Sequence, residues 1–189
     1  MRLLLVAMWV GWLAYWAIAA RGAKATQWRE PLRANWLHYV LAWIGIIVLL
    51  VPFATPAILA EPFLPPSLIG TPIPMGLGVI LTALGLGVAI AARITLAGNW
   101  SARVEIKEDH TLIRSGPYRY VRHPIYSGIL LALLGSAIAL DRWRGLLGFV
   151  LIFASLLLKA RHEENRLRQV LPEYGAYARE TAALIPFLL

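Results

Sequence analysis

The sequence predicts an all-α fold, that of a polytopic helical membrane protein with about five transmembrane helices, a C-terminal helical hairpin and a cytoplasmic helical tail. Two observations lead to this prediction. Of the 189 residues, 59% are hydrophobic and 15% are charged, whereas a soluble domain carries about 25% charged residues. Apolar stretches of helical length also recur along the chain, separated by short polar or proline-rich segments.

Five segments are apolar enough to be membrane helices: 3–20, 39–60, 73–92, 125–140 and 146–158. A span needs about 20 apolar residues, and about 17 at the least, so the first three qualify and the last two are short. We expect the fifth helix to continue past the membrane surface to about Leu171, because Lys159 to Leu171 contains good helix formers and no breaker before Pro172.

Three local features refine these helices. The first segment is predicted to be a retained helix rather than a signal peptide, because three Trp residues interrupt its apolar run. Pro52 and Pro56 are expected to kink the second helix. Asp141, in the short turn between the fourth and fifth helices, is expected to cap the start of the fifth.

The distribution of charge predicts the orientation. Segments 21–37, 93–123 and 159–189 together carry fifteen Lys/Arg residues, and the remaining parts of the chain carry three. The positive-inside rule then places the N-terminus outside and the C-terminus in the cytoplasm. We expect the membrane to be a bacterial inner membrane. The net charge of +8 is assigned to topology and anionic headgroups rather than to nucleic acid. We divide the chain into three N-terminal membrane helices (1–92) and a catalytic region (93–189).

The stretch 110–128, HTLIRSGPYRYVRHPIYSG, is too polar for a span and too specific in composition for a simple tether. Gly116 and Pro117 are typical of a turn, and Pro124 is typical of the first position of a helix. His123 and Tyr126 would then share one face of that helix. The alternative interpretation is a polybasic loop whose tyrosines form an aromatic belt at the membrane interface.

A second polar cluster favours a site over that alternative. Glu163 and Glu164 lie at the end of the fifth helix, and a helical hairpin would bring them to His123 at the start of the fourth. Lys159 would pair with Glu163, four residues away on the same helix. Carboxylates, imidazoles, guanidinium groups and phenols would then meet beside lipid, which suits a polar, cationic cofactor and an apolar substrate.

Other cofactors fit the sequence less well. The run His162-Glu163-Glu164-Asn165-Arg166 lacks the second His of the zinc motif HExxH, and no glycine-rich nucleotide loop is present. The absence of Cys removes disulfides and thiolate ligands. We therefore expect no metal, while haem ligation by two of the four His remains a minor alternative.

The motifs GPYRYVRHPIYSG, EENRL, PEYGAY and LIPF, with a hydrophobic hairpin between the first two, resemble the isoprenylcysteine carboxyl methyltransferase family, whose relatives include phospholipid N-methyltransferases. The resemblance covers about residues 95–186. The RHPxYxG element with the later Glu pair is specific, whereas the first three helices match only as membrane helices. Ala97-Gly98 departs from the usual turn of the family, and Lys159 stands where an Arg is expected.

The resemblance implies a membrane methyltransferase that binds S-adenosylmethionine in a pocket formed by the last two helices and their flanking loops. The residues that would bind this cofactor are His110, Thr111, Leu112, Ile113, Tyr118, His123, Pro124, Ile125, Tyr126 and Glu163. Arg93 and Lys159 would hold the acidic group of the substrate. The sulfonium is a cation, so carboxylates and aromatic faces are suitable partners.

The expected reaction is direct transfer of the sulfonium methyl group to a lipophilic small-molecule or lipidated acceptor, in a bilayer. An isoprenylcysteine-like carboxylate needs only a cationic partner, whereas an amine or thiol must lose a proton, for which His123 or Glu163 would be the base. The sequence does not decide between oxygen, nitrogen and sulfur, nor does it give the oligomeric state. A reductase similar to sterol reductases and a non-catalytic membrane scaffold are the alternatives from other classes.

Overall fold

A computed structural model describes the fold over residues 2–22, 26–29, 36–50, 56–69, 71–97, 100, 105–107 and 112–186. The helices are α1 (Arg2–Ala19), α2 (Trp36–Leu50), α3 (Pro72–Leu96), α4 (Pro124–Leu140), α5 (Trp143–Val170) and α6 (Tyr174–Glu180), with short 3₁₀ turns at Ala20–Gly22, Ala57–Ala60 and Gly116–Arg119.

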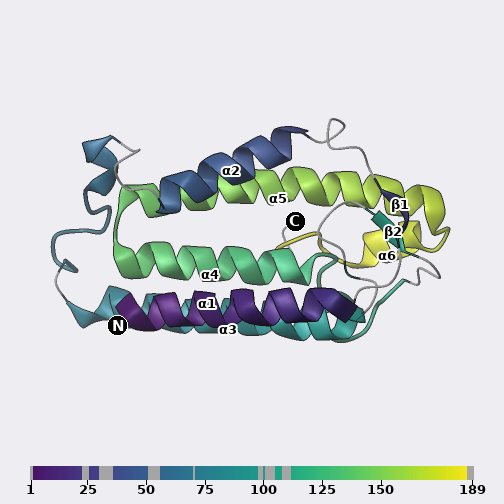
Figure 1. The fold of residues 1–189 in the computed structure, drawn as a ribbon, viewed down its shortest axis with the longest axis horizontal. Helices are drawn as coiled ribbons and strands as arrows, with labels where there is room; N and C mark the ends of the chain where they lie inside the picture. Colours follow the sequence, from purple (N-terminus) through teal and green to yellow (C-terminus); the bar gives the residue numbers. More distant parts are fainter. Residues whose placement is uncertain are drawn as a thin grey trace.

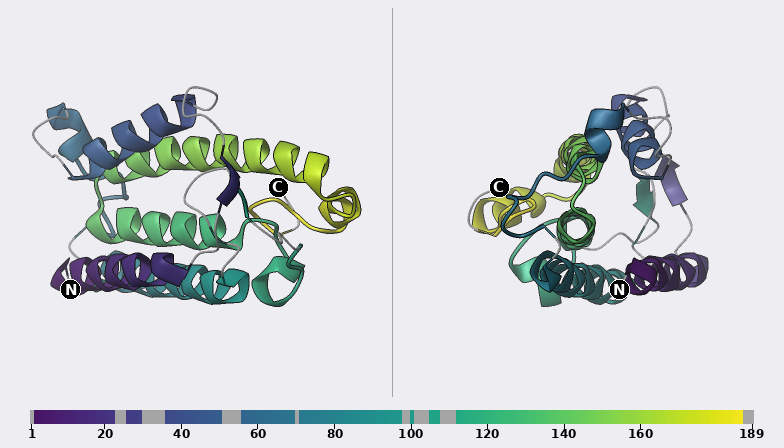
Figure 2. Two further views of the ribbon diagram at one scale, coloured as in Figure 1. Left: turned by 45° about the vertical axis from the view of Figure 1, so that its right-hand side comes forward. Right: turned by 90° about the vertical axis from the view of Figure 1, so that its left-hand side faces the viewer.

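The long helices run side by side (Figure 1). α4 and α5 form the predicted antiparallel hairpin, α3 packs along α4, α2 packs along α5, and α1 lies beside α3. Figure 2 shows the same arrangement nearly end-on, with α1 and α3 adjacent at one side of the bundle and α2 against α5 at the other. This is the architecture of a polytopic helical membrane protein, as predicted.

Within the described residues, three helices are long and apolar enough to cross a membrane: α1 with its 3₁₀ extension, α3 and α5. The fifth helix continues through the Glu pair to Val170, which confirms the expected extension. The second helix is shorter than predicted. α2 ends at Leu50, residues 51–55 with Pro52 lie outside the described residues, and Pro56 is extended (φ −53°, ψ 144°) before a separate 3₁₀ turn. A proline disfavours helical conformation before it and lacks an N–H, so the predicted span 39–60 is wrong at its end.

One small sheet departs from the all-α prediction. Strands β1 (Thr26–Arg29) and β2 (Glu105–Lys107) pair antiparallel and join the α1–α2 connection to the α3–α4 connection. The strands are too short and too polar to give a clear alternating pattern, which is why the sequence did not predict them.

Asp141 closes α4 rather than opening α5. It is in the left-handed conformation (φ 45°, ψ 62°) at the C-terminal end of α4, and Arg142 precedes the first residue of α5 without a side-chain cap. The Asp141 carboxylate instead accepts hydrogen bonds from the backbone N–H groups of Phe63 and Leu64, at 3.0 and 2.9 Å. The predicted cap is therefore wrong, because these amides of the proline-rich loop 56–69 take up the carboxylate.

Glycines allow α3 and α4 to pack backbone against backbone. Gly78 and Gly85 of α3 face Gly135 and Gly128 of α4, and a Cβ added at Gly135 would lie 2.6 Å from the Gly78 carbonyl oxygen. Close approach of this kind is the usual means by which membrane helices associate. Since α4 is fixed against α3 in this way, the position of its first turn, with His123, is fixed too.

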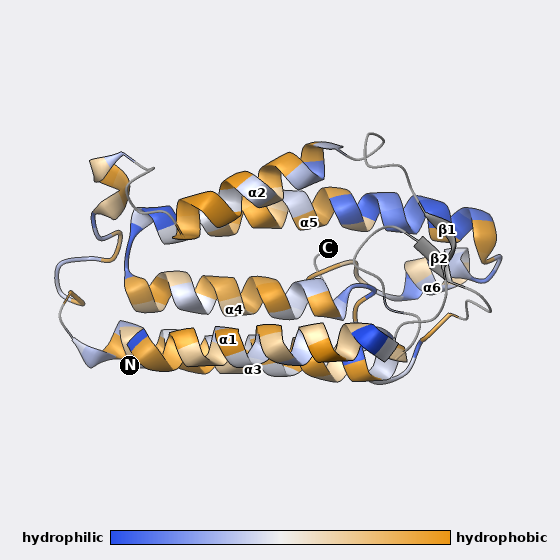
Figure 3. Cartoon of the chain, viewed as in Figure 1, coloured by the Kyte–Doolittle hydropathy of each residue, from blue (hydrophilic) through white to orange (hydrophobic). Residues whose placement is uncertain are grey.

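Hydropathy divides the bundle along its length (Figure 3). Apolar residues cover the helices where they lie side by side, whereas hydrophilic residues gather where α5 extends towards α6. The Glu pair lies in this polar extension, beyond the apolar part of α5.

Candidate functional site

The first turn of α4 is built by turn chemistry. Gly116 has a φ of +56°, and a Cβ there would lie 3.0 Å from the Thr95 hydroxyl oxygen. A 3₁₀ turn follows, and α4 then begins with Pro124 at its first position after His123. This confirms the predicted turn and helix start. The rings of His123 and Tyr126 stack, with centroids 5.3 Å apart and planes at 3°.

Glu163 is the centre of the cluster. The Tyr126 hydroxyl lies 2.8 Å from both Glu163 carboxylate oxygens and donates its proton to them. His123 Nδ1 is 3.6 Å from Glu163 Oε2, and Lys159 Nζ is 3.7 Å from Glu163 Oε1. The predicted meeting of the two helix ends, and the predicted Lys159–Glu163 pair, are thus confirmed. The Glu163 side chain keeps 19% of its surface exposed, so it is not sealed inside the protein.

Glu164 is held differently. Arg122 forms a forked pair with it, Nε to Oε1 at 2.7 Å and Nη2 to Oε2 at 3.3 Å. His123 Nε2 lies 3.2 Å from the same Oε1. Forked pairing of this kind orients both groups strongly. His123 therefore lies between the two carboxylates, and Glu164 fixes its ring.

Arg122 was not singled out from the sequence. Besides Glu164, its Nη1 donates to the carbonyls of Ala178 and Thr181, and its backbone N–H donates to the Ala182 carbonyl at 2.8 Å. Val121 and Ala182 form a parallel bridge. Arg122 thus joins α4, α5 and the segment after α6. The sequence did contain one signal for this role. Arg122 is a basic residue just before a membrane helix, and a buried cation there needs a carboxylate as its partner.

An aromatic and aliphatic cluster borders these carboxylates on the α3 side. It contains the buried Ala92, Tyr118 and Ile125, with Ile113 and Tyr126 packed against them. Burial, and next the negative charge of Glu163, raise the pKa of Tyr118 well above its usual value. Tyr118 therefore stays a neutral phenol beside the carboxylate, and four predicted cofactor residues share this cluster.

A second cluster borders the site on the α6 side. Leu171, Tyr174 and Tyr177 are buried together, and Leu112 packs against them. The Tyr177 hydroxyl donates to the Tyr118 carbonyl at 2.6 Å, which ties α6 to the turn before α4. Burial raises the pKa of Tyr177 to about 12, so it is a neutral donor.

The two predicted substrate cations lie in different surroundings. Lys159 is buried in the carboxylate cluster, and its Nζ lies 5.2 Å from the centre of the Tyr126 ring. Arg93 lies at the end of α3, donates to the Ala97 and Ala19 carbonyls at 2.6 and 2.5 Å, and stacks over Trp100 at 4.7 Å. Tyr118 lies within electrostatic range of both Arg93 and Glu163, so it is near both regions.

The start of helix α2 also lies at this end of the molecule (Figure 1), as the predicted topology requires, but its contacts with the later helices were not predicted. His38 is buried, its carbonyl accepts from Ser155 at 2.8 Å, and it lies within electrostatic range of Lys159 and His162. Tyr39 lies within electrostatic range of Tyr126. No sequence motif links α2 to the later helices, so the nearness of His38 and Tyr39 to them follows only from the packing of α2 against α5.

Most of the predicted site residues therefore come together. Those in or beside the carboxylate cluster are Ile113, Tyr118, His123, Pro124, Ile125, Tyr126, Lys159 and Glu163, with Leu112 at the α6 side. His110 and Thr111 lie outside the described residues. Among the described residues, no group of three His, Asp or Glu side chains is placed to hold a metal ion.

Comparison with known protein families gives a match to this part of the chain. The model of the isoprenylcysteine carboxyl methyltransferase (ICMT) family matches residues 76–169, about half of the chain. Over these residues, the chain belongs to the ICMT family. The match includes α4, most of α5 and every contact of Glu163 and Glu164 described above.

Several curated proteins are similar to this chain, and some of them are named isoprenylcysteine methyltransferases. The cobalt-zinc-cadmium resistance protein CzcN of Cupriavidus metallidurans is 34% identical over 112 residues, which are 58% of this chain and 50% of that protein. A probable protein-S-isoprenylcysteine O-methyltransferase of Oryza sativa is 30% identical over 59% of this chain and 60% of its own length. Protein-S-isoprenylcysteine O-methyltransferase A of Arabidopsis thaliana is 30% identical over 59% of this chain and 58% of its length. The matches span about half to three-fifths of these relatives.

Proposed function

We propose that this protein is an integral-membrane, S-adenosylmethionine-dependent methyltransferase that acts on a lipophilic acceptor. The observation that carries the proposal is the convergence of His123, Tyr126 and Glu163 at the open end of the α4–α5 hairpin. It supports the proposal because a partly exposed carboxylate beside aromatic rings suits a cationic cofactor, and because apolar helices adjoin the cluster.

The described residues fit this cofactor. When bound, S-adenosylmethionine supplies a methyl group on a positively charged sulfur, and on transfer the electron pair of the broken S–CH₃ bond stays on that sulfur. Glu163 would balance the positive charge, the rings of Tyr118 and Tyr126 would face it, and Leu112 and Ile113 would contact the nucleoside. A buried Tyr174 hydroxyl with no partner among the described residues adds a polar group within electrostatic range of Glu163. His110 and Thr111 stay in the proposal through the family resemblance alone.

The acceptor we propose is an apolar molecule with a carboxylate, as in an isoprenylcysteine. Lys159 would hold that carboxylate. Arg93 would be a second cationic partner and would donate from its Nε, which has no partner within the described part of the chain. A carboxylate is ionised at neutral pH, so no general base is needed. Holding acceptor and donor in line, away from water, would supply most of the rate acceleration.

We place the site on the cytoplasmic face of a bacterial inner membrane, with the N-terminus outside. The support is the fifteen-to-three Lys/Arg asymmetry and the position of the polar extension of α5 on the Lys/Arg-rich side. Reporter fusions after Ala60 and after Leu189 should report opposite sides of the membrane. Finding both on the same side would contradict this orientation.

The test of the function is calorimetric titration of the detergent-purified protein with S-adenosylmethionine, S-adenosylhomocysteine and NADPH. We expect binding of the first two and none of NADPH. Binding of NADPH alone would indicate a reductase, and no binding at all would indicate a scaffold. Methyl transfer to an S-farnesyl cysteine, compared with phosphatidylethanolamine, then separates a carboxylate acceptor from an amine.

A further inference from the structure

Tyr174 has a buried hydroxyl that the fold does not satisfy. The residue is 2% exposed, and its Oη has no hydrogen-bond partner among the described residues. Removing a hydroxyl from water without replacing its hydrogen bond is unfavourable, and most buried side-chain hydroxyls have a partner. The position therefore indicates a partner other than the described residues of the chain.

The neighbouring Tyr177 shows that the cluster can satisfy a phenol. The two rings are 5.9 Å apart and belong to the same buried group. The Tyr177 hydroxyl donates to the Tyr118 carbonyl at 2.6 Å, whereas that of Tyr174 has no such acceptor within the described part of the chain. The two tyrosines thus have the same burial and different hydrogen bonding.

Other unpaired buried atoms in the described part of the chain have a different setting. Arg93 has one unpaired nitrogen but satisfies its guanidinium elsewhere. Trp12 is only partly buried on α1, and Arg144 lies beside the α4–α5 turn. Of these residues, Arg93 and Tyr174 are almost fully buried near the candidate site, and of the two only Tyr174 has its whole hydrogen-bonding group without a partner in the described part of the chain.

Tyr174 lies near two parts of that site. Leu112 packs on the cluster that contains Tyr174. Tyr174 is also within electrostatic range of Glu164, Arg122 and Glu163. Burial raises the pKa of Tyr174, so the hydroxyl keeps its proton and can both donate and accept.

We propose that the Tyr174 hydroxyl hydrogen-bonds a ribose hydroxyl of S-adenosylmethionine, an inference that rests on the proposed function. In the proposed site, Leu112 contacts the nucleoside and Glu163 balances the cationic sulfur. The ribose connects these two parts of the cofactor covalently, so we expect it beside a hydroxyl that is near both of them. Ribose hydroxyls donate and accept, which matches a neutral phenol.

The test uses Tyr174→Phe in the full-length, detergent-purified protein, with Tyr177→Phe as the matched control. Affinity is measured by calorimetry for S-adenosylhomocysteine and for 5′-methylthioadenosine, which has the ribose but no amino-acid end. We expect Tyr174→Phe to weaken both by about three- to tenfold, the effect of one hydrogen bond.

Thermal unfolding without ligand gives the second readout. We expect Tyr174→Phe to leave the Tm unchanged or to raise it by about 2–4 °C, because an unsatisfied polar atom is removed. Tyr177→Phe should lower the Tm, because it loses the bond to Tyr118. Only a hydroxyl reserved for a ligand would combine weaker binding with undiminished stability.

Three results would overturn the inference while leaving the proposed function in place. These are equal affinities of parent and Tyr174→Phe, a loss for S-adenosylhomocysteine without a loss for 5′-methylthioadenosine, and a fall in the Tm of Tyr174→Phe like that of Tyr177→Phe. If the parent protein bound neither ligand, the proposed function and this inference would both fall.

Discussion

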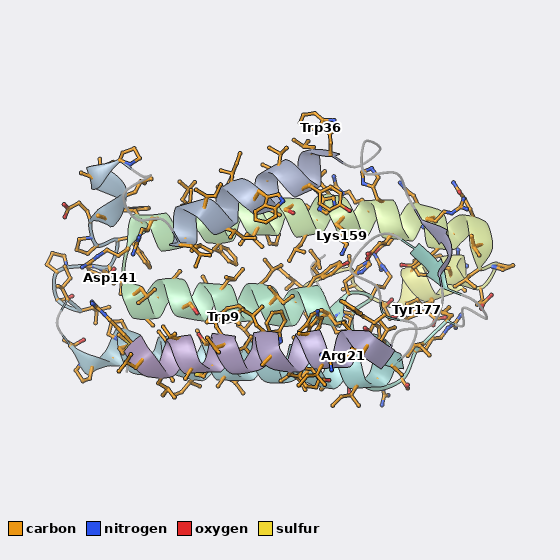
Figure 4. All side chains as sticks on the ribbon, in the orientation of Figure 1. Trp9, Arg21, Trp36, Asp141, Lys159 and Tyr177 are labelled. Carbon is orange, nitrogen blue, oxygen red and sulfur yellow. The ribbon has the colours of Figure 1, made fainter. Side chains whose placement is uncertain are left out.

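The two ends of the α4–α5 hairpin use carboxylates in opposite ways. At the turn end, Asp141 accepts from two backbone amides of the loop 56–69. At the carboxylate end, which we define as His123, Tyr126, Lys159, Glu163 and Glu164, the partners of Glu163 are side chains. Figure 4 shows Asp141 and Lys159 at well-separated positions along the bundle.

The difference indicates which polar groups hold the fold and which are available to a ligand. A carboxylate bonded to backbone amides cannot exchange them without unfolding the loop. Side chains such as Tyr126 and Lys159 can rotate and share their bonds with a ligand. Glu164 is adjacent to Glu163 in sequence, but its forked pair with Arg122 holds the fold, as the bonds of Asp141 do.

The largest effect is expected from Arg122→Ala. Removing this partner leaves Glu164 mostly buried without its forked pair and frees the segment after α6, so the free energy of unfolding should fall by about 3 kcal/mol. Thermal and denaturant unfolding in detergent measure this. A variant as stable as the parent would show that Arg122 does not hold the carboxylate end together.

The next effect concerns binding rather than stability. Glu163→Gln keeps size and helix propensity but removes the charge, so affinity for S-adenosylmethionine should fall about 10- to 100-fold with little change in Tm. Calorimetric titration measures it, and Glu173→Gln, which lies outside the carboxylate end, is the control. If Glu173→Gln weakened binding and Glu163→Gln did not, the assignment of Glu163 would be misplaced.

A smaller effect is expected at the turn end. Asp141→Asn keeps an acceptor oxygen and tolerates the left-handed conformation, but it loses the charge that strengthens the two amide bonds. The free energy of unfolding should fall by about 1 kcal/mol, and cofactor affinity should stay at the parental value. Weaker cofactor binding in this variant would show that the two ends are coupled.

The smallest effect is expected from Tyr120→Phe. Tyr120 is 60% exposed, so it should change stability by no more than about 0.5 kcal/mol. Tyr126→Phe, which loses the bond to Glu163, should weaken cofactor binding. Equal effects of the two substitutions would favour the interpretation of these tyrosines as an aromatic belt.

The sequence by itself determined the helices and the two ends of the site. Apolar length located four of the five long helices closely, and Pro124 located the start of α4. The hairpin then required His123 to meet Glu163, because antiparallel neighbours joined by a short turn bring those ends together. These features depend on local composition and chain connectivity, which a sequence records directly.

Only the tertiary structure decided how the polar groups share their partners. It placed Asp141 on the loop amides rather than on α5, and it paired Glu164 with Arg122, which also bonds the carbonyls of Ala178 and Thr181. It brought His38 from α2 towards Lys159, paired the short strands β1 and β2, and left Tyr174 without an acceptor in the described part of the chain. Each of these outcomes depends on which groups, distant in sequence, lie within about 3 Å once the helices have packed, and that competition has no local pattern.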